Sequence, residues 1–129
     1  TAGERLYLSQ GLTGIRGEAA RGLPGVRDRA LPALRRALAA GRSRNDAGAI
    51  ALLHLIASVE DTNMTARGGP EAARAARTAC AAVLEREALP SMEAIAELDL
   101  DFIRQNLSPG GCADLLAAAF FLLSWQEAE

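Results

Sequence analysis

The sequence has 129 residues, of which 50% are hydrophobic and only 4% are aromatic, so it can form one domain whose core is built mostly from Ala and Leu. Sixteen acidic residues against fourteen basic ones give a formal charge of −2, which argues against nucleic-acid binding because that requires a basic surface. No apolar stretch reaches the roughly 18 residues of a membrane span and no signal peptide is visible, so we expect a cytoplasmic protein without membrane contact.

The first part of the chain is rich in glycine. Residues 4–10 are typical of a short helix that ends at Gly11. In residues 11–26, five glycines recur around Arg16 and Glu18. The segment is either a flexible connector or a backbone that passes close to a ligand, and Glu18 could also simply pair with Arg16.

Two helices are predicted next. Residues 27–40 have an amphipathic pattern that ends at Gly41. After a polar loop, Asn45 or Asp46 is expected to cap a helix over residues 46–61. This second helix is apolar around most of its circumference, so we expect it to lie at the centre of the fold.

Three helices are predicted in the second half. Pro70 opens a long helix to about residue 88, on which Arg74 and Arg77 are expected to be solvated. Ser91 caps a helix over about 92–105, and a final helix runs to about Trp125. The pattern contains no convincing strand, so it predicts an all-α bundle of five or six helices in one domain, residues 1–129.

The two cysteines do not have the spacing of a metal motif. Cys80 lies in an Ala-rich helix and is expected to be a small core residue. Cys112 lies in a Gly-rich turn, where it could be accessible, and a disulfide between the two stays open.

Residues 54–69 carry the first candidate site. The central apolar helix stops there, and Glu60, Asp61, Asn63 and Arg67 follow one another closely. Two adjacent carboxylates beside an amide and a guanidinium suit a metal ion and a phosphate better than a core. His54 precedes this group on the same predicted helix, and it could equally be a core histidine.

Residues 106–114 carry the second candidate site. Ser108 is a candidate N-cap, and Pro109 would occupy the first helical position. Gly110 and Gly111 would leave the N–H groups of the first helical turn open to an anion. Asp114 follows inside a largely apolar helix, so it needs a partner there or acts as an internal capping group.

Three stretches together resemble the triphosphoribosyl-dephospho-coenzyme-A synthase family. They are Gly-Ile-Arg-Gly-Glu-Ala at 14–19, residues 54–63 with Val-Glu-Asp-Thr-Asn at their end, and Asn-Leu-Ser-Pro-Gly-Gly-Cys-Ala-Asp-Leu-Leu at 106–116. Their order and spacing agree with the family as well, although Cys112 stands where Ser or another small residue is expected. The resemblance covers nearly the whole chain but only the C-terminal half of such an enzyme.

The resemblance implies an all-α transferase that uses ATP and 3′-dephospho-coenzyme A. The 2′-hydroxyl of dephospho-coenzyme A would displace adenine from C1 of the ATP ribose, giving the prosthetic-group precursor of citrate lyase or malonate decarboxylase. Such a transfer is expected to pass through an oxocarbenium-like state. It would need a general base and Mg²⁺ on the triphosphate.

Candidate roles follow from that chemistry as hypotheses. Glu60, Asp61 and Asp114 are assigned to Mg²⁺ or to the general base. The residues assigned to substrate or phosphate are Arg16, Glu18, His54, Asn63, Arg67, Ser108, Gly110 and Gly111.

Partners and rival functions also follow from these assignments. We expect the bundle to be completed by an N-terminal half, with the isolated chain inactive, and a homo-oligomer stays open. The alternatives are a non-catalytic helical interaction module and another Mg²⁺-dependent nucleotide hydrolase. The enzyme hypothesis predicts that Glu60, Asp61 and Asp114 converge on one pocket, whereas a structural role would scatter them or bury each against an Arg.

Overall fold

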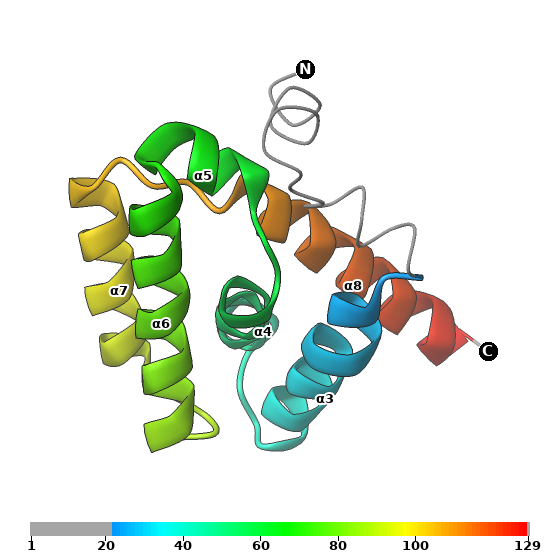
Figure 1. Cartoon of the computed structure of the whole chain (residues 1–129). Helices are drawn as coiled ribbons and strands as arrows, with labels where there is room; N and C mark the ends of the chain where they lie inside the picture. The colour runs from blue at the N-terminus through cyan, green and yellow to red at the C-terminus, as the bar shows by residue number, and fades with distance from the viewer. Residues whose placement is uncertain (1–21, 129) are drawn as a thin grey trace.

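The computed structural model describes residues 22–128, and every regular element in that range is helical. The elements are η1 (Val26–Ala30), α3 (Leu31–Ala39), α4 (Arg44–Ser58), α5 (Thr62–Gly68), α6 (Pro70–Arg86), α7 (Met92–Arg104) and α8 (Gly110–Ala128). Figure 1 shows them gathered into one bundle, which confirms the all-α prediction. The helix predicted at 4–10 lies outside the described residues. Within 22–128, no helix combines the length and apolarity that a bilayer crossing requires.

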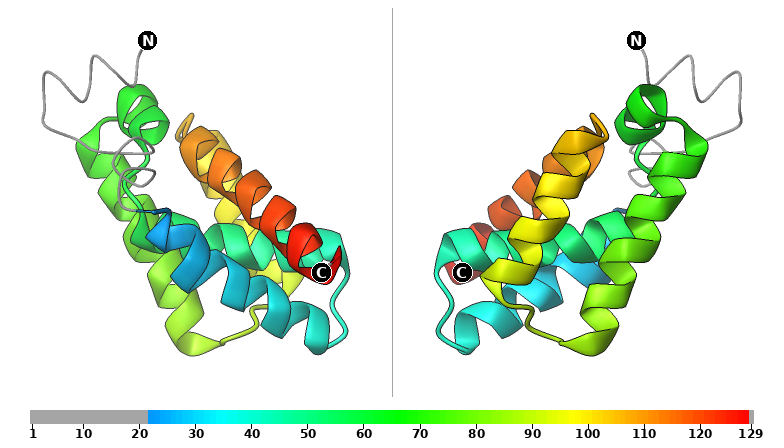
Figure 2. Two further views of the ribbon diagram at one scale, coloured as in Figure 1. Left: turned by 90° about the vertical axis from the view of Figure 1, so that its right-hand side faces the viewer. Right: turned by 90° about the vertical axis from the view of Figure 1, so that its left-hand side faces the viewer.

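The central helix of the bundle is α4, as predicted. Its residues Ala47, Ile50 and Leu55 have no exposed surface. It contacts η1, α3, α6, α7 and α8. In Figure 1 it is seen almost along its axis, with α3 and α8 on one side and α6 on the other. Figure 2 shows α8 crossing over the α4 and α3 side of the bundle.

The end of α4 differs from the prediction. The helix stops at Ser58, and Val59 is already extended (φ −115°, ψ 139°). Asp61 is extended as well, and its side chain accepts hydrogen bonds from the N–H groups of Asn63 and Met64, which starts the short helix α5. The prediction that this helix continues to Asp61 was therefore wrong, because the Asp61 carboxylate caps the next helix instead.

The other helix ends follow local signals. Ser91 accepts from the N–H of Ala94 and caps α7, and Pro70 opens α6, as predicted. The cap of α4 is Ser43, which accepts from the N–H of Asp46 at 3.0 Å. The expectation of Asn45 or Asp46 as that cap was wrong, because the helix begins at Arg44.

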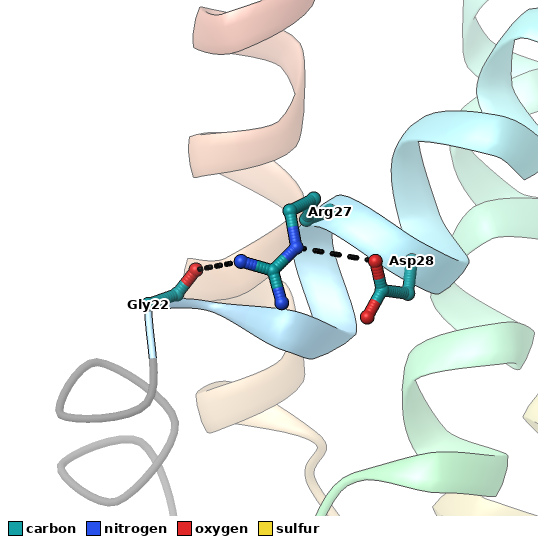
Figure 3. Close-up of polar contacts among 3 residues, drawn as sticks. All are labelled: Gly22, Arg27 and Asp28. Carbon is teal, nitrogen blue, oxygen red and sulfur yellow. Dashed lines mark hydrogen bonds and ion pairs between the residues drawn. The ribbon is translucent and has the colours of Figure 1, made fainter.

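Two arginine side chains form hydrogen bonds with backbone carbonyl oxygens of loop residues. The guanidinium of Arg42 donates to the carbonyl oxygens of Pro90 and Leu89 at 3.1 and 3.2 Å, which ties the α3–α4 loop to the α6–α7 loop. At the start of η1, Arg27 pairs with Asp28 at 3.1 Å and approaches the Gly22 carbonyl at 3.5 Å (Figure 3). The Arg27–Asp28 pair is exposed, so it adds little to stability.

Both cysteines are buried. Cys80 has the core position that was predicted, on α6. Cys112 is fully buried at the start of α8, so the expectation of an accessible thiol in a turn was wrong. The two residues form no disulfide.

Candidate functional site

The site begins with the carboxylate of Asp61, which lies between α4 and α5. Its Oδ1 atom accepts hydrogen bonds from the N–H groups of Asn63 at 3.0 Å and Met64 at 3.2 Å. These two donors belong to the first turn of α5, where no intrahelical acceptor exists for them. The side chain is 6% exposed, so the carboxylate depends on these donors instead of water.

The same carboxylate also reaches α8, fifty residues further along the chain. Its Oδ1 accepts from the N–H of Gly111 at 3.3 Å, and its Oδ2 accepts from the N–H of Cys112 at 2.9 Å. Asp61 therefore serves the N-termini of two helices with one negative charge. The N–H groups of Gly111 and Cys112 had been expected to be open to an anion, but here the anion is the protein's own Asp61.

Asn63 and Gly110 meet at this junction of α5 and α8. A Cβ atom built on Gly110 would lie 3.1 Å from Asn63 Nδ2. This contact would be tight, so any side chain at position 110 would require the Asn63 side chain to shift by a few tenths of an ångström. Asp114 lies one turn beyond Gly110 on the same face of α8 and is exposed to solvent. It has no need of the partner that was expected for a buried carboxylate.

A cavity of about 150 Å³ lies beside Asp61, between α4, α5 and α6. Glu60 and Asp61 line it together with Arg74 and Arg77 of α6. The remaining lining is mostly apolar and comprises Ile56, Val59, Thr62, Met64, Thr65, Pro70 and Ala73. Asp114 does not line it, so the structure brings two of the three candidate carboxylates to one pocket, and neither is buried against an Arg.

His54 lies apart from this cavity. Its side chain is half-buried, and its Nε2 atom has no hydrogen-bond partner among residues 22–128. Burial lowers the pKa of His54, and the positive charges of Arg29 and Arg36 lower it further. Its backbone carbonyl accepts from the Ser58 hydroxyl at 2.7 Å. These surroundings place the imidazole toward η1 and α3 and away from Glu60.

Of the other predicted residues, two lie within the described part of the chain and two lie outside it. Arg67 is exposed near the end of α5, and Ser108 is half-buried in the segment before α8. The bonds recorded at the start of α8 come from Asp61, so the capping role expected for Ser108 belongs to a residue distant in sequence. Arg16 and Glu18 lie outside the described residues.

Of the two carboxylates at the cavity, those of Glu60 and Asp61, only one is available to bind a cation. Within residues 22–128 no three His, Cys, Asp or Glu side chains gather closely enough to hold a metal ion. Mg²⁺ commonly needs only one or two carboxylates, with phosphate oxygens and water as its other ligands. Both oxygens of Asp61 already accept N–H bonds, whereas the exposed Glu60 makes no bond to the described residues. Glu60 is therefore the carboxylate that fits such an ion.

Sequence reasoning missed the arginines of this pocket. Arg74 and Arg77 are three residues apart, so they share one face of α6. Pro70 starts that helix immediately after the 54–69 stretch, with Gly69 (φ 89°) making the turn between α5 and α6. A tight turn after a candidate site was a usable signal, because it folds the following helix back beside the motif.

The two motifs that meet at Asp61 are also those that resemble a known family. The model of the ATP:dephospho-CoA triphosphoribosyl transferase family matches residues 1–129. The chain belongs to this family. It is 47% identical over 126 residues to a 2-(5″-triphosphoribosyl)-3′-dephosphocoenzyme-A synthase of Pectobacterium atrosepticum, with 95% of this chain and 40% of that protein covered.

Two further relatives carry the same enzyme name, preceded by the word probable. Proteins named probable 2-(5″-triphosphoribosyl)-3′-dephosphocoenzyme-A synthase are 42% identical in Malonomonas rubra, over 95% of this chain and 40% of the relative, and 42% identical in Azotobacter vinelandii, over 93% and 42%. The chain thus spans about two-fifths of the length of these relatives. No solved structure matches it.

Proposed function

We propose that this chain is part of a cytoplasmic enzyme that transfers the 5-triphosphoribosyl group of ATP to the 2′-hydroxyl of 3′-dephospho-coenzyme A. The observation that carries the proposal is the Asp61 junction. Its four hydrogen bonds hold two family motifs together beside a pocket that contains Glu60 and two arginines. Membership of the family supports the choice of substrates.

The proposed reaction forms one bond and breaks one. The 2′-hydroxyl oxygen of dephospho-coenzyme A forms a bond to C1 of the ATP ribose, and a base takes the hydroxyl proton. The bond from C1 to adenine breaks, and adenine leaves with the bonding electrons and gains a proton. Positive charge develops on the ribose between these events. A nearby carboxylate stabilises this charge.

Glu60 is the residue that we propose for the general base or for contact with the cation. It is exposed at the pocket and makes no bond to the described residues, so its carboxylate is available. When bound, Mg²⁺ would neutralise charge on the triphosphate. Asp61 acts by position, because its oxygens hold α5 and α8. Asn63 and Asp114 would then contact substrate from the exposed α5–α8 face, where Gly110 leaves room.

The remaining candidates keep substrate-binding roles in this proposal. Arg67 and Ser108 lie on the segments that flank the junction, and Arg16 belongs to the third family motif with Glu18. His54 is the exception, because it does not line the cavity and this proposal gives it no direct contact with substrate.

An apolar groove marks where we propose that the rest of a family-length polypeptide packs. A cavity of about 350 Å³ lies between α4, α7 and the segment before α8 and is lined by apolar residues that include Leu52, Phe102 and Ile103. Ile103 is 65% exposed. Because the relatives are more than twice as long as this chain, a further part of such a protein could cover this surface.

The groove is tested with the rest of a family-length protein produced as a separate polypeptide. We expect Ile103→Glu to weaken its association with this chain at least tenfold, and Ala82→Glu, on the exposed face of α6, to leave association unchanged. Sedimentation of the chain alone is the measurement that could contradict this proposal. A homodimer that Ile103→Glu dissociates would mean that a second copy covers the groove.

The reaction is tested by adenine release in a family-length enzyme that carries this chain. We expect Glu60→Gln to lower turnover with ATP, Mg²⁺ and dephospho-coenzyme A about 100-fold or more. Glu85→Gln, an exposed carboxylate on α6, serves as the matched control and should leave turnover unchanged. Near-normal adenine release by the Glu60 variant would remove Glu60 from the chemistry, and the same assay applies to Asp114→Asn.

A further inference from the structure

Two arginines of α6 face the pocket that contains Glu60. Arg74 and Arg77 both line the cavity, the first exposed and the second half-buried. They lie about one helical turn apart, so their guanidinium groups approach the cavity from the same side of the helix. The helix itself packs against α4 and α5, and this packing fixes the position from which both side chains extend.

Arg74 and Arg77 line the cavity and have no partner among the described residues. Within residues 22–128, neither forms an ion pair or a side-chain hydrogen bond. Arg67 and Arg86 also lack such contacts there, but they do not line the cavity. Other arginines do have such contacts: Arg27 with Asp28, Arg104 with Asp101, Arg42 with two carbonyl oxygens, and Arg44 over the Phe120 ring. The donors of Arg74 and Arg77 are therefore all available to a ligand.

The electrostatic balance of the pocket favours an anion. The charge of Asp61 is already compensated by four N–H donors and two helix N-termini. Two guanidinium groups and the carboxylate of Glu60 remain as the uncompensated charges. Apolar neighbours such as Ile56, Met64 and Ala73 line the same cavity, and they strengthen any charge interaction there by excluding water.

We propose that Arg74 and Arg77 bind a polyphosphate, with Glu60 available for a cation that the phosphates share. Guanidinium groups match phosphate oxygens in pairs, which favours this class of anion. The cavity of about 150 Å³ is below the range of roughly 300–1,000 Å³ that encloses whole drug-sized ligands, so it fits the phosphate portion of a larger molecule. The identity of that molecule rests on the proposed function.

Both proposed substrates carry such a group. ATP has a triphosphate, and dephospho-coenzyme A has a diphosphate. Inorganic tripolyphosphate isolates the shared chemistry because it has neither a sugar nor a base. Separate titrations with ATP and with dephospho-coenzyme A then show which substrate places its phosphates here.

The experiment is calorimetric titration of the 129-residue chain with tripolyphosphate and Mg²⁺. We expect Arg74→Gln and Arg77→Gln each to weaken binding about tenfold, since each removes a charge-assisted contact. Arg86→Gln is the matched control, because Arg86 is an exposed arginine on the same helix that does not line this cavity. It should change affinity less than twofold. Circular dichroism of each variant establishes that it is folded.

Three outcomes would overturn the proposal. The unchanged chain could fail to bind tripolyphosphate, the Arg77 variant could bind as well as the unchanged chain, or Arg86→Gln could weaken binding equally, which would indicate general charge attraction. Because adenine release is measured separately, the two proposals can fail independently. If the Arg74 and Arg77 variants lose tripolyphosphate binding while family-length enzymes with the same substitutions release adenine normally, the anion site is retained and is separate from the reaction.

Discussion

Cys112 donates its backbone N–H to Oδ2 of Asp61 at 2.9 Å, across fifty-one positions of sequence. The other oxygen of that carboxylate accepts from Asn63, Met64 and Gly111. A single buried side chain thus satisfies donors at the start of both α5 and α8. Each family motif holds the other in place through it, so stability and the geometry of the site share one residue.

Asp61→Asn should destabilise the chain more than the loss of an ordinary helix cap. The amide keeps one acceptor but places an NH₂ group against backbone donors and removes the charge, for an expected cost of about 2–4 kcal/mol in the free energy of unfolding. Ser91→Ala removes the single bond that caps α7 and should cost about 1 kcal/mol. Urea denaturation measures both, and equal losses for the two variants would contradict the double-capping role.

Gly68→Ala should also destabilise the chain. A Cβ at this position would overlap with Cδ2 of Leu107, a buried residue of the segment that leads into α8. Overpacking of this kind costs about 1–3 kcal/mol. The double variant with Leu107→Ala tests the contact, because removal of the Leu107 side chain should make the Gly68 substitution nearly neutral. Strictly additive losses in urea denaturation would show that the two residues do not interact.

Native Cys80 and Cys112 should resist thiol reagents. Both are fully buried, and burial raises the pKa of Cys80 to about 12 from 9.0. Since thiolate is the reactive form, a shift of three pH units lowers its fraction at pH 8 by about a thousandfold. Absorbance of released thionitrobenzoate should report two thiols in denaturant and slow reaction without it. Rapid reaction of one thiol under native conditions would contradict the burial of one of the two cysteines.

Much of the helical order was predictable because its signals are local. Pro70 opens α6 and Ser91 caps α7, and each residue acts within one helical turn of its own position. The end of α4 was not predictable from apolar periodicity, since Asp61 could either extend that helix or cap a new one. Asp61 caps α5 in an arrangement that also includes its hydrogen bonds with Gly111 and Cys112. These residues are distant in sequence, so the pattern around Asp61 does not reveal the bonds.

The site was predictable in its residue types more than in its arrangement. Glu60 and Asp61 do share a pocket, but Asp114 is exposed on α8 and does not line that pocket. Arg74 and Arg77 enter the pocket because the turn at Gly69 directs α6 back along α4. Such a direction follows from packing between helices, which the spacing of residues in one helix does not specify.

His54 should make stability depend on pH below neutrality. Burial and the charges of Arg29 and Arg36 lower its pKa in the folded state from the ordinary value of 6.5. As the pH falls below 6.5, the unfolded chain therefore takes up a proton that the folded chain resists. Stability from this residue is present above pH 6.5 and is lost as the pH falls toward the folded-state pKa.

His54→Gln isolates this contribution because glutamine does not titrate. Between pH 7.5 and 5, the free energy of unfolding of the unchanged chain should fall relative to the variant, with a slope of at most about 1.4 kcal/mol per pH unit for one proton. Urea denaturation at several pH values measures the difference, and NMR titration of the imidazole checks the direction of the pKa shift. Parallel curves for the two proteins would mean that His54 has the same pKa folded and unfolded, and that water or another group reaches its Nε2 atom.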